Sequence, residues 1–307
     1  MTMLAPPAVR VTELPTTDRG RGRSVVWMAL PALVAFLSFG LIPLLGALGL
    51  SFTTWDGIGN IQFTGLDSWK AALTDPGLPH TLAVTFEIMI LSWLVQTPIS
   101  ILIGVFIAGR QRYRGLLAVL YFIPLLLSSA AISITFKAIL DPNFGLGSGL
   151  GIGVLNQDWL GDPTLAIAVL IFVVSWQFIP FHSLIYQGAV RQIPTALYEA
   201  SQIDGAGRLR QFFSITLPQI KYTIITSSTL MVVGSLTFFD LIYVLTAGGP
   251  GDATRALALA MYQKGFMANL MGPASCIAVI LVLVGVALSQ LLRRLGGRGD
   301  ESQMEGM

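Results

Sequence analysis

The sequence predicts an all-α integral membrane protein with six transmembrane helices and both termini on the cytoplasmic side. The first of three supporting observations is composition, because 54% of the 307 residues are hydrophobic and 11% are charged, against about 25% charged residues in soluble domains. Second, six segments contain the roughly 20 mostly apolar residues that a membrane-spanning helix needs. Third, lysine and arginine are concentrated in alternate connecting segments, which follows the positive-inside rule.

The first predicted element is a cytoplasmic tail. Residues 1–24 are rich in proline, threonine and arginine, and we expect them to be disordered. They do not form a secretory signal, because the apolar run that follows is too long for the hydrophobic part of one.

Six predicted spans then form one transmembrane domain over residues 25–293, and residues 294–307 form a cytoplasmic C-terminal tail. The spans are residues 25–52, 82–108, 116–140, 165–190, 222–247 and 273–292.

The distribution of basic residues predicts the orientation of these spans. With the N-terminus inside, 14 of the 18 lysines and arginines lie in inner segments and three in outer segments, and Lys137 lies near the outer end of the third span. The inner set is Arg10, Arg19, Arg21, Arg23, Arg110, Arg112, Arg114, Arg191, Arg208, Arg210, Lys221, Arg293, Arg294 and Arg298, and the outer set is Lys70, Arg255 and Lys264. The connection between the fourth and fifth spans is therefore predicted to be cytoplasmic.

The outer connections carry no recognisable nucleotide site. Residues 141–163 contain the glycine-rich run GLGSGLGIGV, but no strand precedes it, so we expect a flexible loop and not a phosphate-binding turn. The pattern G-x-x-x-x-G-K-[ST] is absent from the whole sequence, which excludes a P-loop for ATP in this chain.

Several other classes of site are also excluded. The single cysteine, Cys276, cannot form an internal disulfide framework or a cysteine-rich metal site. The histidine, cysteine and acidic residues do not have the spacing of a metal site or of a nucleophilic triad. We therefore expect neither a metalloenzyme nor an enzyme with such a triad, and no cofactor bound by this chain. The arginines at 19–23 and 110–114 flank spans, so they are interpreted as topology anchors and not as a nucleic-acid patch.

The connection at residues 191–218 differs from an ordinary loop. Pro194 is suited to the first turn of a helix, and Gly205 is expected to end that helix with a positive φ. A second short helix is predicted over 208–216, so the loop consists of two short helices with a sharp bend between them. A helix lying on lipid headgroups would favour lysine and arginine, but no basic residue lies between Pro194 and Gly205. The composition therefore favours docking onto a soluble partner, with a lipid-surface helix as the alternative.

The exposed side of the first helix is predicted to combine small residues, which allow close approach, with larger ones that fill a pocket. Glu199 and Asp204 can accept hydrogen bonds or pair with basic residues. The other members of this predicted docking set are Leu197, Tyr198, Ala200, Ser201, Ile203, Gly205, Ala206 and Gly207.

The run YEASQIDGAGRLRQFFSITLP resembles the cytoplasmic EAA loop of the membrane subunits of ATP-binding-cassette (ABC) importers. The family pattern is E-A-A, a glycine four residues on and I-x-L-P, and it matches Glu199, Ala200, Ser201, Gly205, Ile215, Leu217 and Pro218. Ser201 replaces the third alanine of the pattern by another small residue.

Other stretches extend the resemblance to nearly the whole chain after the tail. FTGLDSWKAALTDPG and YFIPLLLSSAAISITFKAILDPNFG are similar to segments of the carbohydrate branch of these permeases. FFDLIYVLTAGGPGDATRALALAMYQKGF, followed by MGPAS, resembles the fifth span and outer loop of one of its two permease types. The GGP at Gly248, Gly249 and Pro250 is typical of the type related to the first membrane subunit for maltose and glycerol phosphate.

The resemblance implies a type I ABC importer permease fold in a bacterial cell membrane. It also implies a complex with a second, different permease subunit, two ATPase subunits that bind ATP and Mg²⁺, and an extracytoplasmic solute-binding protein. The EAA loop would sit in a cleft of the ATPase, with Glu199, Ala200 and Ser201 in contact and Gly205 as the bend. For Asp204 the resemblance leaves open a local cap or pair and a direct ATPase contact.

The fifth span contains a candidate part of a carbohydrate path. Thr237, Asp240 and Tyr243 recur at i, i+3 and i+6 near one helix face, and Phe239 lies four residues before Tyr243. Aromatic rings can stack on the apolar face of a sugar while a carboxylate accepts from its hydroxyls. The alternative is that a neighbouring subunit satisfies Asp240 and that the rings only pack.

Three further residues are weaker candidates for the path. Trp176 and Gln177 lie in the fourth span, before Pro180, a candidate kink, and Ser128 lies in the third span after Pro124. Each has a structural alternative, which is packing for Trp176 and hydrogen bonding to backbone for Ser128.

The function predicted is that of a permease subunit of an ATP-driven, binding-protein-dependent sugar importer, with no catalytic residues of its own. A stand-alone secondary transporter is the alternative, but its two inverted halves with matching broken helices are not visible in the sequence. A membrane-embedded enzyme would need a cluster of histidines or acids at one membrane depth, and none is evident.

Overall fold

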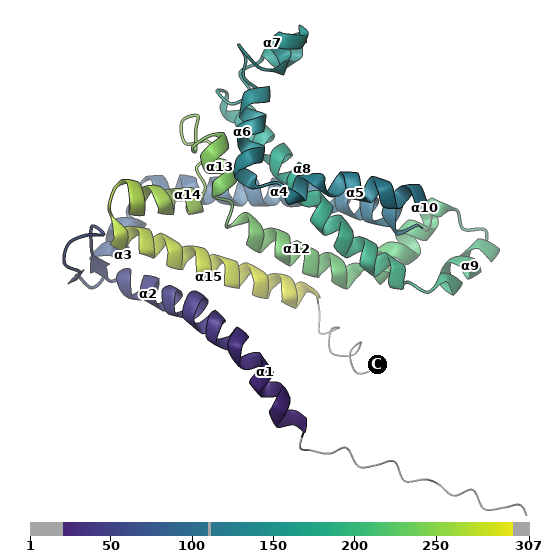
Figure 1. Cartoon of the computed structure of the whole chain (residues 1–307), viewed down its shortest axis with the longest axis horizontal. Helices are drawn as coiled ribbons and strands as arrows, with labels where there is room; N and C mark the ends of the chain where they lie inside the picture. The colour runs from purple at the N-terminus through teal and green to yellow at the C-terminus, as the bar shows by residue number, and fades with distance from the viewer. Residues whose placement is uncertain (1–20, 110–111, 297–307) are drawn as a thin grey trace, which may run out of the picture. The chain divides into compact units, whose positions relative to one another are not determined.

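The computed structural model describes residues 21–109 and 112–296, and in this part of the chain all regular structure except one short hairpin is helical (Figure 1). It contains two compact units, residues 1–46 and 47–307, which are described separately.

The first unit holds α1 (Arg21–Phe36), the π-helical turn η1 (Leu37–Leu41) and the start of α2 (Ile42–Leu50). Because α1 begins at Arg21, the last four residues of the predicted disordered tail are helical. The C-terminal helix likewise continues to Gly296, past the predicted end of the transmembrane domain at 293. The remaining parts of the two predicted tails, residues 1–20 and 297–307, lie outside the described residues.

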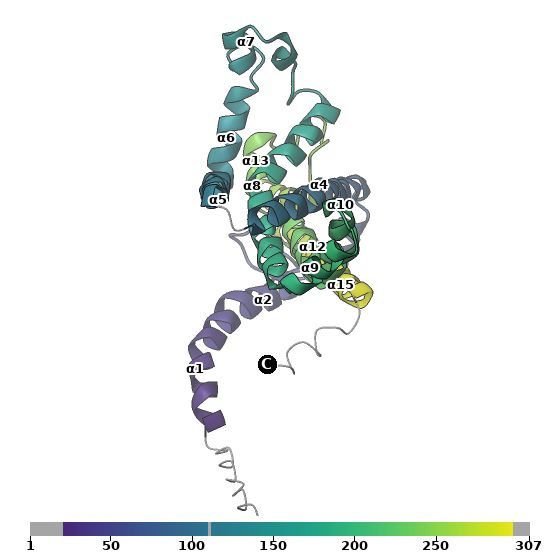
Figure 2. The ribbon, with the colours of Figure 1, turned by 90° about the vertical axis from the view of Figure 1, so that its right-hand side faces the viewer.

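Four helices form the centre of the second unit. They are α4 (Gly77–Ala108), α8 (Pro163–Gln192), α12 (Lys221–Ser235) and α15 (Met271–Gly296). α4 packs along α8, and α12 lies against both α4 and α15 (Figures 1 and 2). α8 begins where it does because the Asp162 carboxylate accepts from the backbone N–H groups of Thr164 and Leu165, both at 2.9 Å, and Pro163 occupies the first turn.

The contact between α4 and α8 depends on a glycine. A β-carbon at Gly104 would lie 2.8 Å from the carbonyl oxygen of Ser183 and 2.8 Å from the β-carbon of Tyr186. Only a residue without a side chain allows the two backbones to approach this closely.

The described residues contain four helices that are long and apolar enough to cross a membrane, or five if one bent pair is a single span. The bent pair is the predicted third span, which turns by 93° between α5 (Arg112–Leu126) and α6 (Ser129–Ile139). Pro124 lacks the N–H that would continue the helical ladder. Ser128 then caps the new helix, since its hydroxyl accepts from the N–H of Ala131 at 3.2 Å.

The predicted fifth span is not one helix. It divides into α12 and the short α13 (Asp240–Leu245), and residues 236–239 are not helical. Two hydroxyls near the break bond to nearby backbone, Ser235 to the carbonyl of Val232 and Thr237 to the carbonyl of Gly234, both at 2.8 Å. Such bonds compete with the helical ladder, which explains why a continuous apolar run fails to give a continuous helix.

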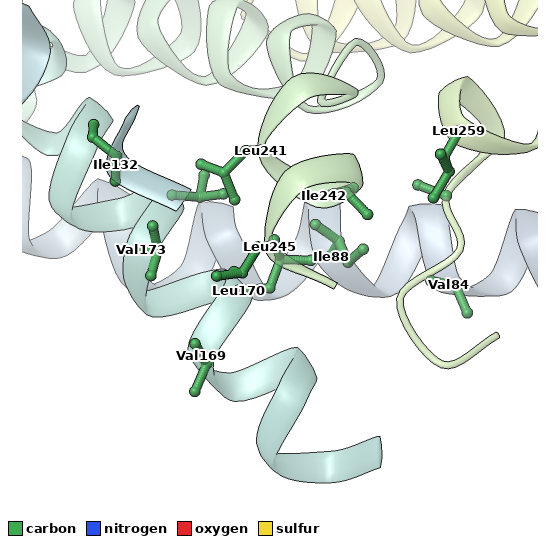
Figure 3. Close-up of a cluster of buried hydrophobic side chains, with 12 residues drawn as sticks. Val84, Ile88, Ile132, Val169, Leu170, Val173, Leu241, Ile242, Leu245 and Leu259 are labelled. Carbon is green, nitrogen blue, oxygen red and sulfur yellow. The ribbon is translucent and has the colours of Figure 1, made fainter. Parts of the chain in front are cut away.

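A cluster of twelve buried side chains joins the elements around these breaks (Figure 3). Members come from α4, α6, α8 and α13 and from the segment around α14 (Leu257–Tyr262). They are Val84, Ile88, Ile132, Val169, Leu170, Val173, Val174, Leu241, Ile242, Leu245, Ala256 and Leu259. The cluster fixes the broken halves of two spans against the continuous α4 and α8.

The segments between the spans form short ordered elements. The hairpin of β1 (Thr53–Thr54) and β2 (Gln62–Phe63) is antiparallel, with Thr53 opposite Phe63, and α3 (Asp67–Leu73) follows it. Ser68 donates to the carbonyl of Thr53 at 2.7 Å, and Met271 donates from its backbone to Trp55 at 3.0 Å, so α3 and α15 hold the hairpin. The glycine-rich run predicted as a flexible loop forms α7 (Leu146–Leu150) and the 3-10 turn η2 (Gly153–Asn156).

An ion pair links two connecting segments that are far apart in sequence. Lys264, in the π-helical turn η4 (Gln263–Met267), contacts the carboxylate of Asp75, which also accepts from the N–H of Gly77 at 2.8 Å. The hydrogen bond from Lys264, followed by that from Gly77, lowers the pKa of Asp75 below its ordinary value of 3.8. The pair therefore stabilises the fold fully above about pH 4, and this contribution is lost as the pH falls through the lowered pKa.

We expect Asp75→Asn to lower the free energy of unfolding at pH 7 by about 1 kcal/mol, because the pair is partly exposed. At pH 3 the difference from the wild type should shrink, because below about pH 3.8 protonation of Asp75 in the unfolded chain begins to offset the stabilisation. Thermal unfolding of the purified protein at both pH values measures this, with Asp67→Asn, at an exposed carboxylate, as control. An equal difference at the two pH values would contradict the role of the pair.

Candidate functional site: a helical loop and an apolar cavity

The loop at residues 191–218 contains the two predicted helices and the bend. α9 (Thr195–Ile203) begins after Pro194, and α10 (Arg208–Gln211) begins after Gly207. Gly205 has a φ of +75°, and the N–H of Ala206 donates to the carbonyl of Ser201 at 2.8 Å. This is a Schellman cap, which requires a left-handed residue at the position of Gly205.

The second helix is longer than predicted. It continues from α10 through the π-helical turn η3 (Phe212–Thr216) into α11 (Leu217–Gln219), so Pro218 lies inside the helix and does not end it.

One side of α9 is exposed and carries most of the predicted docking set. Glu199, Ala200 and Asp204 are exposed, Leu197 is 40% exposed, and Ile203 is 87% exposed. Gly205 and Gly207 in the bend are also exposed, while Ala206 is half-buried. The result is a surface with a carboxylate at Glu199, small residues beside it and one fully presented apolar side chain.

Tyr198 and Ser201 do not belong to this exposed side, contrary to the prediction. Both are half-buried. Tyr198 packs on a cluster of buried side chains that includes Ile101 and Ile220, and Ser201 donates to the carbonyl of Tyr198 at 2.7 Å.

Two exposed apolar residues of the second helix enlarge the surface and were not in the predicted set. Leu209 is 75% exposed and Phe213 60% exposed, whereas the adjacent Phe212 packs inward. The structure thus separates Phe212 from Phe213, its immediate neighbour in sequence.

A cavity of about 290 Å³ lies between the spans. α4, α8 and α12 supply most of its wall, and α5 and the break after α12 supply one residue each. The lining residues are Met89, Ser92, Trp93, Gln96, Leu125, Phe178, Phe181, His182, Leu230, Met231, Gly234, Ser235 and Phe238. Phe178 and Phe238 stack with ring centres 5.6 Å apart, so the aromatic part of the wall joins α8 to the break.

The polar groups of the cavity wall are uncharged amide, hydroxyl, indole and imidazole groups. Trp93 donates from its indole to the hydroxyl of Ser228 at 2.8 Å, and His182 Nδ1 lies 2.9 Å from the hydroxyl of Ser227. Gln96 is 3% exposed. Within residues 21–109 and 112–296, no aspartate, glutamate, lysine or arginine lines the cavity, so the described wall carries no acidic or basic side chain of these types.

The predicted path residues of the third and fourth spans do not line the cavity. The Gln177 amide donates to the hydroxyl of Ser129 at 3.1 Å. The Trp176 ring packs edge-to-face on Phe136, with ring centres 5.5 Å apart. Ser128 caps α6 by accepting from a backbone N–H. This is the hydrogen bonding to backbone that the sequence left open as the structural alternative for Ser128.

The predicted path residues of the fifth span also lie outside the cavity wall, beyond Phe238. Thr237 and Asp240 are exposed. Phe239 stacks on Tyr243 with ring centres 5.4 Å apart, and Tyr262 of α14 packs against both. These residues therefore form an aromatic cluster beside an exposed carboxylate.

No group of three or more histidine, cysteine or acidic side chains in the described residues could hold a metal ion. The two features of this part of the chain that suggest function are thus the exposed surface of the 191–218 loop and an uncharged cavity.

Residues 96–298 match the family described as the binding-protein-dependent transport system inner membrane component. The chain belongs to this family. The permease is therefore the inner-membrane part of a transport system that depends on a binding protein, and the predicted location and the prediction of a transport subunit instead of an enzyme are confirmed.

Individual relatives agree with the family. The permease is 31% identical over 278 residues to a Bacillus subtilis (strain 168) protein named as a probable ABC transporter permease, YurN, covering 88% of this chain and 95% of the relative. It is 31% identical over 263 residues to the multiple sugar-binding transport system permease protein MsmF of Streptococcus mutans, covering 83% and 89%.

The fold is that of a type I ABC importer permease, as predicted. A chain of a bacterial alginate ABC transporter, solved with an alginate pentasaccharide-bound periplasmic protein, superimposes with a TM-score of 0.79 over 91% of this chain and 96% of that one, at 22% identity.

Proposed function

We propose that the permease is one of two membrane subunits of an ATP-driven importer for neutral sugars. The observation that carries this proposal is that packed side chains connect the exposed loop at residues 191–218 to the helices that line the cavity. Tyr198 of the presented loop packs on a cluster that contains Ile101 of α4 and Tyr186 of α8, and α4 and α8 both line the uncharged cavity. Sugar transport is supported by the name of the relative MsmF.

The topology that belongs to this proposal is six crossings with both termini inside. Lysine and arginine support the orientation, because the loop that contains α9 and α10 carries Arg191, Arg208 and Arg210. In Figure 1, α9 and α10 lie at one end of α12, and α3 and α14 lie toward its other end. The bent α5–α6 pair and the α12–α13 pair would then each count as one broken span.

The partners in this proposal are a second permease subunit, two ATPase subunits and the binding protein. ATP and Mg²⁺ would bind to the ATPase subunits, and the presented surface of α9 would sit against one of them. Glu199, Ala200, Asp204 and Leu197 are the proposed contacts, together with Ile203, Leu209 and Phe213, which are exposed on the same loop.

The cavity is the proposed solute chamber. Phe178, Phe181 and Phe238 can stack on sugar rings, and Gln96 and Ser235 can hydrogen-bond to their hydroxyls. Thr237, Phe239, Asp240 and Tyr243 follow directly on the Phe238 wall, and we place them on the path beyond the chamber. Trp176, Gln177 and Ser128 support the chamber from outside and do not contact the solute.

Filling the chamber tests this assignment. A β-carbon at Gly234 meets no atom within 4 Å, so the Leu side chain of Gly234→Leu extends into the cavity without straining the helix. We expect at least about a tenfold loss of sugar uptake by the reconstituted complex, roughly the effect of losing 1.4 kcal/mol of binding, with assembly unchanged.

Uptake is measured in proteoliposomes across a panel of neutral and acidic sugars, each with and without ATP. Gly188→Leu is the matched control, since a β-carbon there also meets no atom within 4 Å and Gly188 does not line the cavity. Normal uptake by Gly234→Leu would show that the solute does not pass through this cavity. Uptake without ATP by the permease alone would overturn the proposed function.

A further inference from the structure

The bend between α9 and α10 is held by side chains as well as by its backbone. The amide of Gln211, at the end of α10, donates to the hydroxyl of Ser201 at 2.8 Å and to the carbonyl of Tyr198 at 3.3 Å. The Ser201 hydroxyl itself donates to the same carbonyl at 2.7 Å. Gln211 therefore bonds across the bend to two successive turns of α9.

A second connection continues inward from the same place. The hydroxyls of Tyr198 and Thr216 lie 2.9 Å apart, and Thr216 of η3 is buried. The Tyr198 ring packs on the cluster that includes Ile101 of α4, Tyr186 of α8 and Ile220 before α12. The inner side of α9 is thus joined to the three helices that supply most of the cavity wall.

The backbone of the bend is poorly suited to transmit force by itself. Gly205 and Gly207 have no side chains, and a β-carbon at either would meet no atom of the described residues within 4 Å, so these two glycines are flanked by open space. Glycines flanked by open space allow rotation about several backbone bonds. Without the Gln211 bonds, movement of α9 would be absorbed as a change of angle at residues 204–207.

We propose that Gln211 is a positioning residue for energy coupling, which fixes the angle between α9 and the following helix so that movement of the presented surface reaches the cavity-lining spans. This inference rests on the proposed coupling role of the loop. It also explains Ser201, the departure from the third alanine of the EAA pattern, because only a hydroxyl at this position can accept from the Gln211 amide.

Gln211→Leu tests the proposal, since leucine keeps the bulk of glutamine and removes both bonds. We expect the complex to assemble normally. We expect its ratio of ATP hydrolysed to sugar transported to be several times that of the wild type. We also expect backbone amides of residues 203–208 to exchange with deuterium about tenfold faster, the effect of two lost hydrogen bonds on local opening. Gln219→Leu, at an exposed glutamine of α11, is the matched control.

A double-mutant cycle with Ser201→Ala distinguishes loss of the bond between Gln211 and Ser201 from a general loss of stability. Ser201→Ala should raise the ATP-to-sugar ratio in the wild-type background and leave it unchanged in the Gln211→Leu background, because the shared bond is already absent. Equal effects in both backgrounds would overturn the inference, as would an unchanged ratio with unchanged exchange in Gln211→Leu.

The variants distinguish an error in the proposed coupling role of the loop from an error in this inference alone. If the loop does not bind the ATPase, Glu199→Arg retains full uptake. If only this inference is wrong, Glu199→Arg stops uptake while Gln211→Leu keeps the wild-type ATP-to-sugar ratio.

Discussion

Replacing Glu199 by arginine is expected to abolish sugar uptake while leaving the permease folded in the membrane. Among the described residues no hydrogen bond or ion pair holds the Glu199 side chain, and it is exposed on α9. Its replacement therefore removes no contact within the permease. A reversed charge in the proposed ATPase contact would cost about 2–5 kcal/mol of binding, which corresponds to a loss of affinity between roughly thirtyfold and several thousandfold.

The measurement combines co-purification of the ATPase subunits with uptake by the reconstituted complex. Gln219→Arg is the control, because it places the same new charge on an exposed residue of α11, just past the loop and outside the presented surface. Uptake at the wild-type rate by Glu199→Arg would contradict a docking role for this residue.

The course of the loop at residues 191–218 could be predicted because local backbone chemistry determines it. Proline has a restricted φ, which favours a helix start after Pro194, and glycine readily adopts the positive φ that ends α9 at Gly205, so the structure has the helix between them. The inward side of this helix could not be predicted. α9 has nine residues, and its pattern does not distinguish a face that packs on Ile101 and Ile220 from one that meets a partner.

The broken spans show how far single residues can be interpreted. Both Pro124 and Pro180 lie in predicted spans, yet the helix turns sharply a few residues after Pro124 and continues through Pro180 to Gln192. A proline removes one donor in either case. What differs is the neighbourhood, because Ser128 is available to cap a new helix after Pro124.

The cavity was missed for a related reason. Sequence reasoning selected residues with charge or unusual chemistry, such as Asp240 and Trp176, and neither lines the cavity. Gly234 and Phe238 do line it, although glycine and phenylalanine are ordinary in any span. They line the cavity because of where α12 ends, and no local sequence pattern in this apolar run predicts that end.

Gly104→Val is expected to prevent α4 and α8 from packing, and so to lose folded protein. The first added carbon would already lie 2.8 Å from the carbonyl oxygen of Ser183 and 3.1 Å from the backbone nitrogen of Gln187. These are backbone atoms of a continuous helix and cannot rotate away as a side chain would. We expect a loss of about 3 kcal/mol or more in the free energy of unfolding, at the upper end for overpacked cores.

Gly104→Ala should show a smaller loss of the same sign, since alanine adds only the first of these carbons. The yield and thermal unfolding of the purified permease measure both variants, with Gly188→Val on α8 as control, where a β-carbon meets open space. Because α4 contributes Gln96 and α8 contributes Phe178 to the cavity wall, any Gly104→Ala protein that folds should also bind its sugar more weakly. Wild-type unfolding by Gly104→Val would mean that the two helices do not approach each other as closely as the structure has them.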